Sequence, residues 1–158
     1  MKILIATAAI FALSPFASAT EISVEFGPKI DDEWKDTYGE RELERLSDDV
    51  REDLERALDK RGIETQRIEV TILDAKPNRP TFEQLGDRPG LDFGRSVSIG
   101  GMALAGEAFD ADGNLLLSNE YSWFENDIRQ SVNRATWGDA NRASNRFAVQ
   151  FAKELSNQ

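Results

Sequence analysis

The first half of the chain combines two hydrophobic periodicities, one typical of strands and one typical of helices. In "EISVEF" (21–26) and "RIEVTIL" (67–73) every second residue is apolar, so each segment is predicted to be a strand with one buried face. Between them, from about Gly39 to Arg61, apolar residues recur every three or four positions and form one stripe on a helix: Leu43, Leu46, Val50, Leu54 and Leu58. Gly62 then supplies a left-handed helix end. A helix of this length can connect two parallel strands by a right-handed crossover.

The second half is predicted to form a hairpin and a final helix. "SVSIGGMALAGEAFDADGNLLLSNEYSWFE" (96–125) contains a turn at Asp112-Gly113-Asn114, and its glycines predict a bulge or a close backbone approach (Gly100, Gly101 and Gly106). Thr136 and Asp139 have capping-box spacing before a helical stripe of Ala140, Ala143, Phe147, Phe151 and Leu155. The predicted fold is α+β: one domain with a mixed sheet of about four strands and two helices on one face, in the order β-α-β-loop-β-β-α.

The first nineteen residues have the composition of a secretory signal peptide. Lys2 precedes an apolar run from Ile3 to Leu13, and Ala17-Ser18-Ala19 is a small-residue cleavage site. The run is shorter than the roughly 20 residues that span a bilayer, and no cysteine follows the site to accept a lipid. We therefore expect a soluble periplasmic or secreted domain, residues 20–158, without a membrane span.

Composition excludes several function classes. Loss of residues 1–19 leaves 139 of the 158 residues and changes the net charge from −10 to −11, which disfavours nucleic-acid binding. The chain has no His and no Cys, so His-dependent and Cys-dependent nucleophilic systems and the common zinc sites cannot be built. We predict no cofactor and no metal, and stability that comes from packing alone.

The elements in order resemble a known group. The signal peptide, the "VEF" strand, the amphipathic helix, the "VTILDA" strand, the "DGN" hairpin and the terminal "WGDANRASNRFAVQFAKEL" helix are similar to small periplasmic bacterial proteins catalogued as a domain of unknown function. The resemblance covers nearly all of the mature chain. It implies the compartment and the fold, and it transfers no catalytic residue, since such families have no established activity.

Three constellations suggest chemistry, and each has a structural interpretation. "DADGN" (110–114) resembles a calcium loop, but with Gly113 at the sixth position the first is Ala108 and the twelfth is Asn119, so a hairpin turn is favoured. Dispersed carboxylates offer an acid and base pair, although in so acidic a chain solvated charges are favoured (Asp74, Asp87, Asp92, Glu107, Glu120 and Glu125). The aromatic residues offer a stacking platform, although a core role is favoured (Trp34, Tyr38, Tyr121, Trp123 and Trp137).

The segment 75–96 fits neither a helix nor a strand pattern and is predicted to be a long ordered loop. It concentrates Pro, Gly and basic residues, and its candidate ligand-binding or partner-binding residues are Arg79, Phe82, Arg88, Asp92 and Arg95. We expect Phe82 and Phe93 to anchor the loop and the arginines to face outward. The alternative is that the arginines pair with Asp87 and Asp92 and only fasten the loop to the domain.

Two functions of different classes follow from these observations. The favoured one is a non-enzymatic accessory or binding protein of the bacterial envelope, whose partner is another envelope protein or an envelope component. The alternative is a small carboxylate-dependent hydrolase acting on envelope polysaccharide. No residue is predicted to be catalytic, and the sequence carries no signal for oligomeric state.

Overall fold

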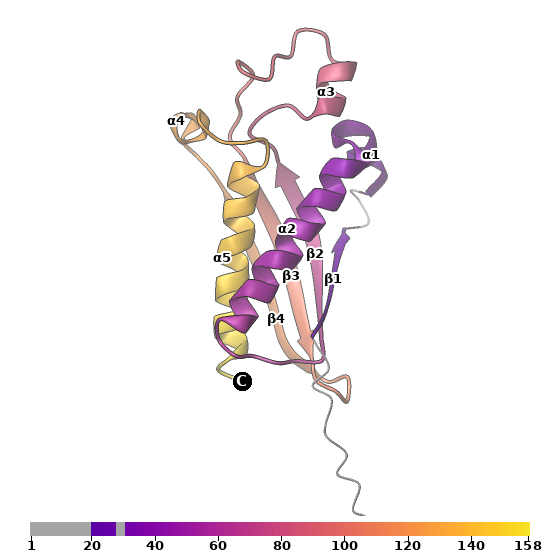
Figure 1. Cartoon of the computed structure of the whole chain (residues 1–158), viewed down its shortest axis with the longest axis vertical. Helices are drawn as coiled ribbons and strands as arrows, with labels where there is room; N and C mark the ends of the chain where they lie inside the picture. The colour runs from indigo at the N-terminus through magenta and orange to yellow at the C-terminus, as the bar shows by residue number, and fades with distance from the viewer. Residues whose placement is uncertain (1–19, 28–30) are drawn as a thin grey trace, which may run out of the picture.

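The computed structural model describes residues 20–27 and 31–158 (Figure 1). The predicted signal peptide, residues 1–19, lies outside this range. In the described residues the elements follow the order β1 (Glu21–Phe26), α1 (Asp31–Tyr38), α2 (Glu40–Asp59), β2 (Arg67–Lys76), α3 (Phe82–Asp87), β3 (Gly101–Phe109), β4 (Leu115–Phe124), α4 (Ile128–Ser131) and α5 (Gly138–Leu155). The predicted α+β class is confirmed, and α1, α3 and α4 are added to the predicted order.

The strands form one mixed sheet in the order β1-β2-β3-β4. β1 and β2 are parallel, with Val24 opposite Val70, and the other two pairs are antiparallel. α2 makes the crossover between the parallel strands, as its length predicted. The register of β2 on β3 shifts between Ile72 and Asp74, so Leu73 forms a bulge and is 41% exposed.

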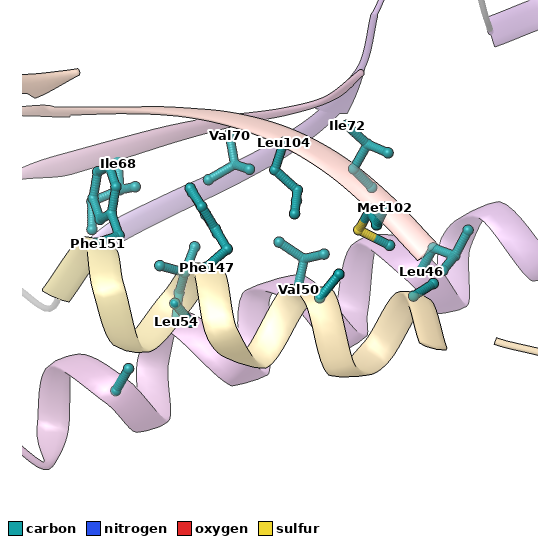
Figure 2. Packing of buried hydrophobic residues seen from close by; sticks show 14 of the residues in the cluster. Leu46, Val50, Leu54, Ile68, Val70, Ile72, Met102, Leu104, Phe147 and Phe151 are labelled. Atoms are coloured by element: carbon teal, nitrogen blue, oxygen red, sulfur yellow. The ribbon is translucent and has the colours of Figure 1, made fainter. Parts of the chain in front are cut away.

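α2 and α5 cover the same face of the sheet, and their apolar stripes meet the strands in one core (Figures 1 and 2). The central side chains are Leu46, Val50 and Leu54 from α2, Ile68, Val70 and Ile72 from β2, Met102 and Leu104 from β3, and Phe147 and Phe151 from α5. Burial of each such side chain contributes about 1.5–3 kcal/mol. The other face of the sheet carries the polar residues of the alternation, among them the exposed Glu25, Glu107 and Glu120.

Glycines fix the ends of α2 and the spacing of α5. Gly39 and Gly62 have φ of 90° and 62°, a region that favours glycine, and they flank α2 as predicted. In β3, a Cβ at Gly106 would lie 2.7 Å from Phe147 Cζ and 2.9 Å from a Phe151 ring atom. The close approach predicted at Gly106 therefore exists, but it is made by aromatic side chains of α5.

Asp139 differs from its predicted role. α5 begins at Gly138 with Trp137 as its N-cap, and no side chain caps it, so the predicted Thr136–Asp139 capping box is wrong. Asp139 is completely buried and accepts hydrogen bonds from other segments. Asp139 therefore accepts hydrogen bonds from Asn78, Gly100 and Ser131 and does not cap α5.

Candidate functional site at the tip

The segment 77–100, with α3, extends beyond the sheet end where β2 stops, and α1 and α4 lie beside it (Figure 1). We call this end of the molecule the tip, made of residues 77–100 and 125–137. The prediction of an ordered loop without helix or strand over 75–96 is wrong at two places. Ala75 and Lys76 continue β2, and 82–87 form α3.

Arg79 fastens the two segments of the tip to each other. Its Nε donates to the backbone oxygen of Arg134 at 2.8 Å, and its second guanidinium nitrogen donates to the backbone oxygens of Phe93 at 2.8 Å and Gly94 at 3.1 Å. Its third nitrogen donates to the Val132 oxygen. The side chain is partly buried and its donors point inward, so the prediction that Arg79 faces outward is wrong.

A buried polar cluster lies at the base of the tip. Asp139 Oδ2 accepts from Asn78 Nδ2 at 2.6 Å, from Ser131 Oγ at 3.0 Å and from the Gly100 backbone at 3.3 Å. Asn78 Oδ1 in turn accepts from the Asp139 backbone at 2.8 Å. Arg134 Nε lies 3.2 Å from Asp139 Oδ1, an ion-pair contact without hydrogen-bond geometry. Because buried charge is costly unless it is paired, these contacts fix α5 against both tip segments.

Local caps order the exposed part of the tip. Thr81 and Gln84 form a reciprocal capping box at the start of α3, with contacts of 3.1 and 3.3 Å. Asp92 Oδ1 accepts from the backbone nitrogens of Gly94 at 2.9 Å and Arg95 at 2.8 Å. Asp92 thus has a structural role in the turn that follows α3.

Phe82 is the most exposed large apolar side chain of the described residues, at 83%. Phe93 is 49% exposed, and Ile128 and Val132 on the neighbouring segment are 47% and 50% exposed. The prediction that Phe82 anchors the loop is therefore wrong. α3 is capped at its start and lies between Arg79 and the Phe93 and Gly94 backbone oxygens that Arg79 binds, and the Phe82 side chain stays in solvent.

Two hollows adjoin Phe82. One, of about 280 Å³, is lined by Phe82 and Phe93 and by Trp137, Glu42 and Arg45 among others. The other, of about 420 Å³, shares Phe82, Glu42 and Arg45 and extends to Tyr38. Trp137 Nε1 donates to Glu42 Oε2 at 2.7 Å, so the polar end of this buried indole is satisfied at the wall.

The aromatic residues that were considered as a stacking platform form packing contacts in the described structure. Phe26, Trp34, Tyr38 and Trp137 form an edge-to-face chain with centroid distances of 6.0, 5.5 and 5.4 Å, which joins α1 to the start of α5. On β4, Trp123 is covered by the guanidinium groups of Arg142 and Arg146 at 5.2 and 4.6 Å. The favoured core interpretation of these residues is consistent with both contacts.

Three described titratable groups with displaced pKa values lie on separate elements: Tyr38 on α1, Asp49 on α2 and Asp110 in the turn after β3. Burial raises the pKa of the Tyr38 phenol and of the Asp49 carboxyl, whereas hydrogen bonds, those from Asn114 first, lower the pKa of Asp110. Asp110 uses both carboxylate oxygens to cap the hairpin turn, bonding the Asn114 side chain and the Asp112 and Asn114 backbones. In the described part of the chain no group of three or more acidic residues converges as a metal site would require.

The predicted site residues all lie at one end of the molecule, but some have structural roles and the others are exposed. Arg79 and Asp92 hold the tip together, whereas Phe82, Arg88 and Arg95 are exposed on it. Among the described residues none of the three arginines forms an ion pair with Asp87 or Asp92, so the fastening predicted through those acids is wrong. Sequence reasoning missed Asn78 and Ser131, and it named Trp137 as an aromatic core residue without placing it beside Phe82. The Thr81-x-x-Gln84 spacing was a signal that could have identified α3.

No protein-family model matches this chain, and no curated protein matches it in sequence. Among solved structures it is similar to a minor lipoprotein from Acinetobacter baumannii, with 14% sequence identity and a TM-score of 0.39, over 87% of this chain and 92% of that one. At this TM-score the likeness carries no argument about function. The resemblance to periplasmic proteins of a domain of unknown function stays a prediction.

Proposed function

We propose that this protein is a non-enzymatic binding protein of the bacterial envelope that contacts a partner protein through the tip. The observation that carries the proposal is Phe82, which is 83% exposed on a helix that is capped at its start and is followed by the Phe93–Gly94 backbone that Arg79 binds. An ordered aromatic side chain in solvent forgoes roughly 1.5–3 kcal/mol that burial would provide. A partner that covers Phe82 recovers this free energy.

The surroundings of Phe82 suit a protein contact. Exposed aromatic and arginine side chains are the residues that most often dominate binding energy at protein interfaces. Phe93, Arg88 and Arg95 lie in the same segment, and the smaller hollow, which is lined by Phe82, Phe93 and Trp137 among others, can receive an apolar side chain of a partner. Because Arg79 and the Asp139 cluster fix the backbone, little conformational entropy is lost when the tip binds.

The envelope compartment is inferred from the N-terminal sequence. The apolar run and the Ala17-Ser18-Ala19 site direct the chain to export, and the folded domain starts with β1 two residues after Ala19. In the described residues no helix has both the length and the hydropathy needed to cross a membrane.

A photoreactive phenylalanine analogue placed at single positions in living cells tests the proposal. We expect a discrete cross-linked protein adduct from position 82 and none from Val149. Val149 is a matched control because it is an apolar residue that is 44% exposed, and it lies in the second half of α5, away from the tip. Phe82→Ala should abolish a protein adduct trapped from position 93. Adducts of equal yield from 82 and 149, or none from 82, would contradict a role for the tip.

A further inference from the structure

A third hollow at the tip is lined by basic side chains. It has a volume of about 320 Å³ and lies where the ends of α1 and β2 meet α3 and the loop that follows it. Among its described lining residues three are cationic, Lys76, Arg79 and Arg88, and none is acidic. The chain has a net charge of −10, so a wall without carboxylates is a local region of positive charge that attracts anions. We call this space the basic hollow.

The basic hollow is separate from the contact surface proposed above, because neither Phe82 nor Phe93 lines it. Gln84, which lines it, follows Phe82 by two positions and therefore lies about 200° from it around the axis of α3. A ligand in the basic hollow and a partner at Phe82 thus use different sides of α3. Ligand binding here does not depend on the proposed protein contact.

Two of the three cations have no partner in the described protein. Arg79 donates to backbone oxygens of both tip segments, so it fixes the walls of the hollow and adds positive charge. The Lys76 ammonium and the Arg88 guanidinium are exposed, and neither forms a hydrogen bond or an ion pair with a described residue. Several other arginines do have acidic partners, for example Arg51 with Asp48 at 2.6 Å. The donors of Lys76 and Arg88 are therefore available to a bound anion.

Two hydroxyl groups add neutral donors to the same wall, those of Tyr38 and Ser96. Ser96 Oγ accepts a hydrogen bond from the Asp92 backbone at 3.0 Å, which leaves its own proton for a ligand. Burial raises the pKa of the Tyr38 phenol, and the charge of Asp74 raises it further, whereas Arg88 lowers it. The phenol therefore keeps its proton at neutral pH and can donate it to an acceptor.

The rest of the wall is apolar and includes Pro77, Pro80, Leu91 and Val97. A mainly apolar wall with a few convergent polar groups is typical of small-molecule sites, and the volume is at the lower end of their range, roughly 300–1,000 Å³. The hollow can thus receive a small organic group together with a charged one.

We propose that the basic hollow binds a small phosphate monoester, with the phosphate at Lys76 and Arg88 and the organic group against Leu91 and the prolines. A phosphate monoester carries about two negative charges at neutral pH and three acceptor oxygens. It can therefore bind both cations and the two hydroxyl groups at once, whereas a carboxylate has one charge and two oxygens. Arg binds phosphate through two parallel hydrogen bonds, and Lys binds it as a point charge.

Isothermal titration calorimetry of the purified exported protein with phenyl phosphate tests the proposal. We expect one saturable site, and about tenfold weaker binding of benzoate, which has the same ring but only one negative charge. Inorganic phosphate, which lacks the ring, should bind several-fold more weakly than phenyl phosphate. No binding of phenyl phosphate at millimolar concentration, or equally tight binding of benzoate, would overturn the proposal. Equally tight binding of inorganic phosphate would exclude the role of the apolar wall.

Variants of equal charge locate the site. Lys76→Gln and Arg88→Gln each remove one cation of the basic hollow and should each weaken phenyl phosphate binding about tenfold. Arg61→Gln is the control, because it changes the net charge equally but lies just beyond the end of α2, far from the tip (Figure 1). Its affinity should stay within about twofold, since exposed charges at long range are screened. Circular dichroism checks that the variants are folded. Equal losses in Arg88→Gln and Arg61→Gln would reject the site.

Vesicles that contain phosphatidic acid separate two sources of a phosphate monoester, a lipid headgroup and a soluble ester. We expect the protein to stay in the supernatant when such vesicles are sedimented, because its net negative charge is repelled by an anionic surface. Vesicle binding that Arg88→Gln abolishes would retain the phosphate chemistry and assign the site to a lipid headgroup.

Discussion

Arg79 acts through carbonyl oxygens of two segments, so its removal should loosen the whole tip. Hydrogen bonds from charged groups contribute about 1.5–3 kcal/mol each when they are buried, and less when they are exposed as several here are. We expect Arg79→Ala to lower the free energy of unfolding by about 2 kcal/mol in urea denaturation. Arg95→Ala is the control, because that side chain is exposed and should change stability by less than about 0.5 kcal/mol. Equal effects of the two changes would exclude the role assigned to Arg79.

Asp49 on α2 should make stability depend on pH. One of its carboxylate oxygens is buried without a hydrogen-bond partner, and burial raises the pKa of the carboxyl although a hydrogen bond with Asn141 lowers it. A raised folded-state pKa means that the folded protein binds the proton more tightly than the unfolded chain. The stability from this proton is fully present below the unfolded pKa, about 3.9, and is lost as pH rises through the folded pKa.

Asp49→Asn should therefore raise the melting temperature at pH 7, and the gain should vanish below about pH 3. Thermal unfolding followed by circular dichroism from pH 3 to 7 measures this. Asp48→Asn removes the same charge from an exposed position and should not reproduce the pH profile. A gain that persists unchanged at pH 3 would mean that burial of the charge is not the cause.

At the scale of elements, we expect Ala to have opposite effects on stability at two glycines, Gly86 in the helix α3 and Gly106 in the strand β3. Nothing lies within 4 Å of a Cβ built at Gly86 in α3, and Ala there should raise the free energy of unfolding by about 0.5–1 kcal/mol. A Cβ at Gly106 in β3 meets two phenylalanine rings below 3 Å, so Ala should cost about 1–3 kcal/mol. Chemical denaturation of both variants compares them. A stable Gly106→Ala protein would show that α5 can move away from the sheet.

At the scale of the whole molecule, we expect export to remove residues 1–19 by cleavage after Ala19, just before β1. Thr20 is the first residue after the predicted cleavage site, and its Oγ1 accepts a hydrogen bond from the Thr65 backbone at 3.3 Å. We expect N-terminal sequencing to give Thr20 and osmotic shock to release the protein without detergent. Recovery of a chain that begins at Met1 from the membrane fraction would contradict this prediction.

The periodicities of the sequence by themselves determined the class of fold and most element positions. The stripe from Leu43 to Leu58 and the alternation around Val24 and Val70 follow from local geometry, since a helix and a strand each repeat with a fixed period. The turn at Gly113 and the helix end at Gly62 are local as well, because they depend on a backbone conformation that glycine favours.

Only the tertiary structure decided what the tip residues do. Arg79 and Asp139 have hydrogen-bond partners 8 to 61 residues away, in other segments, and no pattern within one element specifies such contacts. The same packing left Phe82 in solvent, although its chemistry suggested an anchor, because backbone hydrogen bonds and a capping box already hold α3. Burial and exposure depend on the neighbours that the fold assembles, and a residue's type alone does not supply them.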